Sequence, residues 1–308
     1  MRITSDMSYR MLSQALAKHQ AGIQKYHQQI SSGKEVEKGS DDPGAFGMIG
    51  ALKSDLTRLE QYKRNADMAL SYHKAVDQSL TQAVNMLHRI NELAVKGGDA
   101  TLDETSRAAL AEEVDALLES MLAQANGTDG SRYVFAGLRS DAAPYEATRD
   151  AATGKILSVQ YVGSQETRQI KTGDSQYVST NFPGSTATSE QGIFQTGTRD
   201  IFNSIVELRQ RLESGQSVAD SDCMENLQGD LDHLLANVSL NGVRQEQVTL
   251  QRTYLLQQQL ANQEATEKFE SVDLASATIK LSAEETAYQA ALSSTSRMLQ
   301  QVNLLDYL

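Results

Sequence analysis

Residues 9–30 read YRMLSQALAKHQAGIQKYHQQI, and this stretch decides the fold. Its apolar or weakly apolar side chains recur at alternating steps of three and four residues, the heptad spacing of a helix that packs along a partner helix. The positions of this first seam are Tyr9, Leu12, Leu16, His19, Ile23, Tyr26 and Ile30. Because polar side chains flank the seam, the helix has one narrow apolar face and needs a partner to be stable.

A second seam with the same spacing lies near the other end of the chain. Its positions are Leu274, Thr278, Leu281, Glu285, Tyr288, Leu292, Thr295, Leu299 and Val302. Residues 1–34 carry five Lys or Arg side chains and one Asp, whereas residues 270–308 carry five acidic and two basic side chains. Opposite charge favours pairing of these two segments over pairing of either with itself. The sequence therefore predicts a helical hairpin whose ends form a coiled coil.

The segments inside the two seams also read mostly as helix. Asp42 suits the N-cap of a second helix and Pro43 its first position, and Gly97-Gly98 stops that helix. A third helix ends at Asn126-Gly127. No Gly or Pro occurs from residue 243 to residue 308. If continuous, a helix over that range would be about 100 Å long, which indicates a rod or coiled coil.

Residues 131–198 have a different texture, richer in Gly, Ser and Thr. Leu157, Val159 and Tyr161 alternate with polar residues and are followed by turn signals, which predicts strands. The predicted fold is mainly α, a long helical-hairpin rod with a small β-rich insert domain. Its expected parts are an N-terminal assembly helix (1–38), a first rod half (39–130), the insert (131–198), a second rod half (199–269) and a C-terminal assembly helix (270–308).

Composition excludes several classes of function. The net charge is −12, so nucleic acid is not an expected partner. The sequence contains no run of about 18 apolar residues, so we expect no membrane insertion, and the N-terminus lacks the apolar core of a cleavable signal peptide. Cys223 is the only cysteine, which rules out a disulfide within the chain.

The residues that invite a search for chemistry have simpler structural interpretations. Five histidines occur without a His-x-x-x-His spacing, so packed or solvated histidines are expected rather than a metal site. Asp41-Asp42 before Pro43 is typical of a helix cap, and Cys223 has no histidine near it in sequence. We therefore expect no catalytic residue, no metal and no cofactor, and not an enzyme.

Several motifs together resemble the flagellin family of bacterial flagellar proteins. They are residues 26–34 (YHQQISSGK) followed by Ser40-Asp-Asp-Pro43, residues 131–137 (SRYVFAG), and Asp273-Leu-Ala275 with the Ala- and Ser-rich helix after it. The ending NLLDYL, residues 303–308, is similar to family members at the junction between hook and filament rather than to the filament subunit.

The resemblance implies a structural function. Family members are exported unfolded through the flagellar type III apparatus, and an export chaperone is an expected partner. They assemble outside the cell with copies of themselves, with a neighbouring hook-associated protein and with flagellin. The resemblance thus implies an adapter between hook-associated region and filament. Two alternatives stay open, namely flagellin itself and a secreted coiled-coil protein of another type III system.

The two seams give the candidate site. The expected assembly interface consists of Tyr9, Leu12, Leu16, Ile23, Tyr26, Ile30, Leu274, Leu281, Tyr288, Leu292, Leu299 and Val302, with Asp42 and Pro43 as structural caps.

Overall fold

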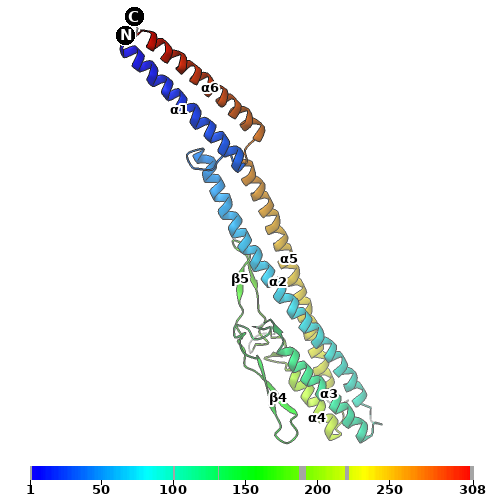
Figure 1. The fold of residues 1–308 in the computed structure, drawn as a ribbon. Coiled ribbons are helices and arrows are strands. Elements are labelled where there is room, and N and C mark those ends of the chain that lie inside the picture. The colour runs from blue at the N-terminus through cyan, green and yellow to red at the C-terminus, as the bar shows by residue number, and fades with distance from the viewer. Residues whose placement is uncertain (1, 100, 131, 187–191, 219–221, 306–308) are drawn as a thin grey trace. The chain divides into compact units, whose positions relative to one another are not determined.

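The computed structural model describes residues 2–99, 101–130, 132–186, 192–218 and 222–305, and these are mainly helical (Figure 1). The helices are α1 (Arg2–Ser32), α2 (Pro43–Gly97), α3 (Glu104–Ala125), α4 (Ile201–Ser214), α5 (Cys223–Glu270) and α6 (Leu274–Leu305). The strands are β1 (Thr128–Asp129), β2 (Arg132–Tyr133), β3 (Tyr145–Arg149), β4 (Ile156–Tyr161), β5 (Gln169–Lys171), β6 (Tyr177–Ser179), β7 (Ser185–Thr186) and β8 (Gln195–Thr196). The prediction of a mainly α fold with long helices and a small β-rich insert is confirmed.

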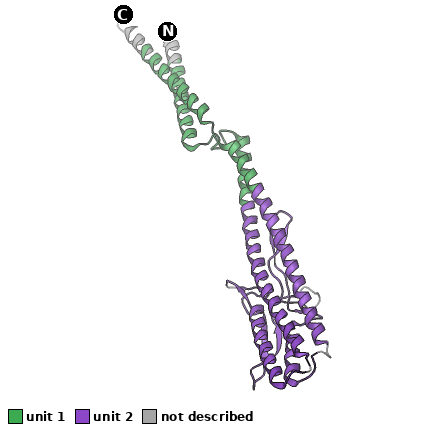
Figure 2. Ribbon diagram, turned by 90° about the vertical axis from the view of Figure 1, so that its right-hand side faces the viewer, with its two compact units in different colours: residues 1–58, 258–308 green, residues 59–257 purple. Residues whose placement is uncertain are grey.

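The chain divides into two compact units, coloured separately in Figure 2. Unit 1 consists of residues 1–58 and 258–308, and unit 2 of residues 59–257. Each of the long helices α2 and α5 contributes residues to both units. Unit 1 therefore contains both ends of the chain, and unit 2 contains the β-rich insert.

The main core of unit 2 forms because one face of α2 is apolar at helical spacing. Its side chains at Val76, Leu80, Leu87 and Ile90 are fully buried. They belong to a cluster that also takes in the apolar faces of α3, α4 and the start of α5. Four aromatic rings of this cluster contact one another edge-on or at a tilt. They are Phe135, Tyr145 and Phe194 of the insert and Phe202 of α4.

A second core cluster joins α2 to α5 inside unit 2. Leu59, Tyr62, Ala66 and Ala69 of α2 pack with Val248 and Leu255 of α5. Ala66 and Ala69 are fully buried and contribute small side chains to this cluster. Both clusters lie within residues 59–255 and therefore belong to unit 2.

The insert is built from two-stranded pairs. β1–β2, β3–β4 and β5–β6 are antiparallel, and β7–β8 is parallel. The predicted alternation in β4 was wrong at Leu157, which is 46% exposed while Ile156 and Val159 are buried. A register irregularity in the β3–β4 ladder skips Leu157, because Thr148 pairs with Ser158 and Arg149 with Ile156. A bulge of this kind changes the face on which the following side chain lies.

One buried arginine ties the insert to the helices. Arg209 of α4 is 2% exposed and forms an ion pair with Asp115 of α3. Its Nη2 donates to the carbonyl oxygen of Ile156 in β4 at 2.6 Å. A buried guanidinium is tolerated only when it is paired and hydrogen bonded, so these contacts determine where β4 lies against α3 and α4.

The C-terminal helix is interrupted, contrary to the continuous helix considered above. α5 ends at Glu270 and α6 begins at Leu274, although the segment holds no Gly or Pro. Asp273 caps α6, since its Oδ1 accepts from the amides of Ala275 at 3.0 Å and Ser276 at 3.2 Å. The backbone of Val272 donates to Gly33 O at 3.0 Å. Contacts with a segment more than 200 residues away thus override the local helix propensity.

Candidate assembly interface

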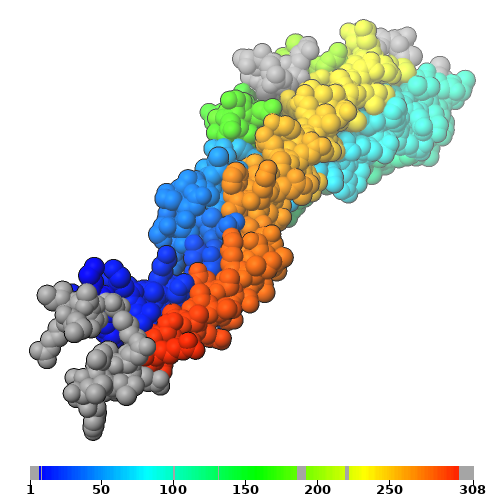
Figure 3. Space-filling view, turned by 90° about the horizontal axis from the view of Figure 1, so that it is seen from above, coloured from blue at the N-terminus to red at the C-terminus, as the bar shows by residue number. Residues whose placement is uncertain are grey.

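The first and last helices lie side by side in unit 1 (Figures 1 and 3). On α1 the half-buried positions include six of the predicted first seam: Leu12, Leu16, His19, Ile23, Tyr26 and Ile30. On α6 the buried or half-buried positions include Ala277, Leu281, Glu284, Tyr288, Ala291 and Thr295, again at steps of three and four. The contact face of α6 is therefore made largely of small and polar side chains, which permit a close helix pair.

A polar contact lies in the middle of this pair. Nδ1 of His19 is 2.6 Å from Oε2 of Glu284, and both side chains are about 30% exposed. Gly22 allows this approach, because a Cβ added there would be 3.0 Å from the Glu284 carboxyl carbon. Farther along, Nε2 of His27 is 4.0 Å from Oε1 of Glu285. Contacts between histidines of α1 and glutamates of α6 thus connect the two helices. The charge comparison of the two segments in the sequence analysis counted only Lys and Arg as basic and did not include these histidines.

The end of the pair is closed by a backbone and ion-pair junction. Gly33 ends α1 with a φ of 70°, a left-handed conformation that glycine adopts without strain. The amide of Glu35 donates to the carbonyl of Glu270 at 2.7 Å. The Glu270 carboxylate lies 2.7 Å from Nζ of Lys34 and 3.0 Å from Nζ of Lys53. The hydrogen bond from Lys34 lowers the pKa of Glu270, and the same contact raises the pKa of Lys34.

The turn before α2 is held by two aspartates. Oδ1 of Asp42 accepts from the amides of Gly44 at 2.9 Å and Ala45 at 3.0 Å, and Pro43 is the first helical residue. Oδ2 of Asp41 accepts from the amides of Glu37 and Lys38, and these backbone hydrogen bonds lower the pKa of Asp41. The two carboxylates therefore accept hydrogen bonds from the backbone amides of this turn and of the start of α2.

Three further predicted interface residues of α1 and α6 are exposed. Tyr9 is 56% exposed, Leu274 54% and Leu292 44%. Met7, Met11 and Ile279 are equally large apolar side chains left at the surface, and the sequence analysis did not include them. The side chains of Leu299 and Val302 lie outside the described residues. Unit 1 thus has an inner set of half-buried residues and an outer set of exposed apolar ones.

The described residues contain no group of three or more His, Cys, Asp or Glu side chains arranged to hold a metal ion. Across the same ranges, no helix combines the length and the apolar character that a membrane span requires. Cys223 is 1% exposed, and burial raises the pKa of its thiol to about 11, so the reactive thiolate is scarce at neutral pH.

Comparison with known proteins identifies the N-terminal part. Residues 3–139 match the model of the bacterial flagellin N-terminal helical region. These residues are similar to the flagellin family. The flagellar hook-associated protein 3 of Salmonella typhimurium is 31% identical over 172 residues, which cover 55% of this chain and 54% of the relative. The chain thus spans about half the length of the curated relatives it matches.

A filament protein and a solved structure are also similar to this chain. The flagellar filament 41 kDa core protein of Borreliella burgdorferi is 27% identical, over 33% of this chain and 30% of that protein. The crystal structure of flagellar hook-associated protein 3 from Legionella pneumophila superposes with a TM-score of 0.61 at 17% identity, over 71% of this chain and 98% of that one. The last likeness shows a shared fold.

Proposed function

We propose that this chain is a structural subunit of the bacterial flagellum, an adapter that joins the hook-associated region to the flagellin filament. The observation that carries the proposal is the paired α1 and α6, which meet through small and polar side chains and leave large apolar ones exposed. Exposed apolar side chains such as Tyr9, Leu274 and Leu292 are available to a partner surface, and large exposed apolar patches mark such surfaces. The resemblance to hook-associated protein 3 supports the same reading.

The proposal assigns the parts of the chain as follows. Residues 1–38 and 270–308 are the assembly segments, residues 39–130 and 199–269 form the helical body, and residues 131–198 form the insert. The adapter contacts copies of itself, a neighbouring hook-associated protein and flagellin. It reaches the outside of the cell through the flagellar export apparatus with a chaperone. It carries no catalytic activity.

The second candidate function is the filament subunit, flagellin itself, and the likeness to a filament core protein over a third of the chain favours it. The two candidates differ in copy number and place. Gold-labelled antibody against the chain, applied to sheared flagella, should mark only the end next to the hook if the adapter proposal holds. Label along the whole filament would overturn the adapter in favour of flagellin.

A further inference from the structure

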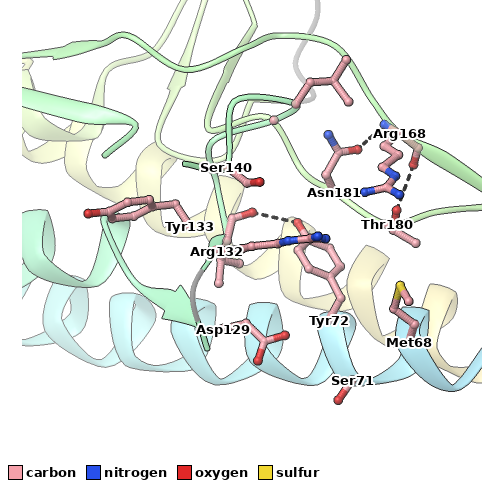
Figure 4. A pocket seen from close by; sticks show the side chains of 13 residues that line it. Met68, Ser71, Tyr72, Asp129, Arg132, Tyr133, Ser140, Arg168, Thr180 and Asn181 are labelled. Atoms are coloured by element: carbon pink, nitrogen blue, oxygen red, sulfur yellow. Dashed lines mark hydrogen bonds between the residues drawn. The ribbon is translucent and has the colours of Figure 1, made fainter. Parts of the chain in front are cut away.

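Unit 2 holds a pocket of about 190 Å³ that the assembly helices of unit 1 do not contribute to (Figure 4). Met68 and Tyr72 of α2 form its floor, and the rest comes from the segment around β1 and β2 and from residues 168–181. Two hydrogen bonds of the Tyr72 hydroxyl tie these walls together, one donated to Val134 O at 2.9 Å and one accepted from the amide of Phe182 at 2.5 Å.

The pocket has an unusual charge for this chain. Arg132 and Arg168 line it and are exposed, and neither forms an ion pair with a carboxylate in the described ranges. Asp129 is the one acidic residue in its lining, so the lining carries a net positive charge while the chain carries −12. Met68 is 55% exposed and Leu138 47%, which adds apolar surface beside the guanidinium groups. A carboxylate with apolar neighbours has the matching chemistry.

Such a surface exists elsewhere in unit 2, on α5. Val243, Leu250 and Tyr254 are 51%, 64% and 53% exposed, and Glu246 beside them is exposed without an ion pair in the described part of the chain. At about 100° per residue these four side chains fall within about 80° of one another around the helix. The buried Val248 and Leu255 lie on the opposite face, toward α2. The four residues, named here the α5 strip, form a ridge about 17 Å long at 1.5 Å per residue.

We propose that the α5 strip of one copy of this chain docks on the Arg132–Arg168 pocket of a second copy, with the Glu246 carboxylate between the two guanidinium groups. Charge complementarity selects this occupant. The lining of the pocket is net positive and attracts the Glu246 carboxylate, whereas most of the remaining surface of this acidic chain repels a second copy. The two surfaces consist of different residues, so the contact is heterologous and extends from copy to copy. The inference rests on the proposed function only in that an adapter must assemble with itself.

Cysteine cross-linking of the purified full chain tests this contact, because native Cys223 is buried and leaves a low background. Leu138 lines the pocket and Gln247 is exposed beside Glu246. The chain carrying both Leu138→Cys and Gln247→Cys should form a ladder of disulfide-linked dimers and larger oligomers on mild oxidation. An equal mixture of the two single variants should stop at dimers. Dimers formed by Gln247→Cys alone would mean that the strip meets itself, and absence of the ladder would also overturn the proposal.

A charge reversal sharpens the result. Adding Glu246→Arg to the double-cysteine chain should lower the cross-linked fraction about tenfold, since close charge pairs at interfaces are coupled by at least that factor. Adding Arg132→Glu and Arg168→Glu as well should restore it, while Glu146→Arg, at an exposed acid of β3, should leave it unchanged. Failure of the restoration would exclude this pairing. A variant without the ladder that still supports attached filaments would reject the contact and leave the adapter function standing.

Discussion

His73 shows at the level of one residue how burial and hydrogen bonding oppose each other. The ring is fully buried in unit 2. Nδ1 lies 2.9 Å from Oδ1 of Asn241, and Nε2 lies 3.1 Å from the carbonyl oxygen of Ser179. Two acceptors favour the doubly protonated ring, whereas burial and the nearby Arg244 guanidinium favour the neutral one. Burial is the larger effect and lowers the pKa of His73 below 6.5.

The first prediction concerns acid stability. Because the folded pKa of His73 is lowered, the unfolded chain binds a proton first as pH falls below about 6.5, so unit 2 should lose stability in that range. Urea unfolding at pH 7.5 and pH 5 should show a lower free energy of unfolding at pH 5. The difference should shrink in His73→Gln and persist in the control His88→Gln, at an exposed histidine. A wild-type chain that becomes more stable on acidification would show that the two acceptors dominate.

The second prediction concerns Glu270, which closes the junction of unit 1. Its pKa is lowered by Lys34 and Lys53, so its stabilising effect is present above its ordinary value of 4.5 and is lost as pH falls through the lowered pKa. At pH 7, Glu270→Gln should speed hydrogen exchange at the amides of Glu35 and Val272, which bond across the junction. The control Glu264→Gln, at an exposed acid of the same helix, should leave exchange unchanged. Equal protection in both variants would refute an electrostatic role for Glu270.

At the scale of elements, the sequence predicted what depends on local chemistry and periodicity. The helix that starts at Pro43, the stop at Gly97 and the heptad face of α1 follow from caps, glycines and spacing. The break between α5 and α6 could not be predicted from local sequence, because it depends on hydrogen bonds with residues 33–35, which are far away in the chain. The bulge that exposes Leu157 and the buried Arg209 likewise depend on partners distant in sequence.

The burial of the candidate site residues could be predicted only in part, for a related reason. A run of residues at steps of three and four defines a helical stripe, yet it does not say which edge of the stripe faces the partner. Leu281 and Tyr288 lie on the contact face of α6, whereas Leu274 and Leu292 lie at the exposed edge. The small Ala277 and Ala291 take part in the contact and were missed, because an alanine gives a weak hydrophobic signal.

The third prediction separates these two faces with a matched pair of substitutions. Leu281→Asp places a carboxylate on the half-buried face and should weaken the pairing of α1 with α6 by about 1–3 kcal/mol. Leu292→Asp changes an exposed side chain and should leave the pairing intact. Circular dichroism of the isolated chain should therefore lose helix only in Leu281→Asp, whereas complementation of a strain lacking the gene should fail with both. Normal filaments with Leu292→Asp would remove the outer face from the assembly interface.

At the scale of the whole molecule, the described core clusters lie in unit 2 and the proposed assembly segments in unit 1. Unit 2 buries two continuous apolar clusters, whereas α1 and α6 are mostly half-buried or exposed. We therefore expect different parts of the chain to provide stability and assembly.

The fourth prediction follows from this division. Deleting residues 1–34 or residues 270–308 should leave unit 2 folded, with a main thermal transition within about 3 °C of the full chain, because neither deletion removes a residue of the two core clusters. Neither truncated chain should enter flagella. Differential scanning calorimetry is the measurement, and electron microscopy of complemented cells is the companion assay. Cooperative loss of the main transition in either truncation would mean that the terminal helices belong to the core.

The adapter function is tested most directly by electron microscopy of cells that lack the gene, together with assay of flagellin in their medium. If the chain is the proposed adapter, filament subunits cannot attach without it, whereas hook assembly and export do not depend on it. We expect intact hooks without filaments and flagellin free in the medium, with filaments restored by the wild-type chain. Full filaments on cells that lack the gene would contradict the adapter function.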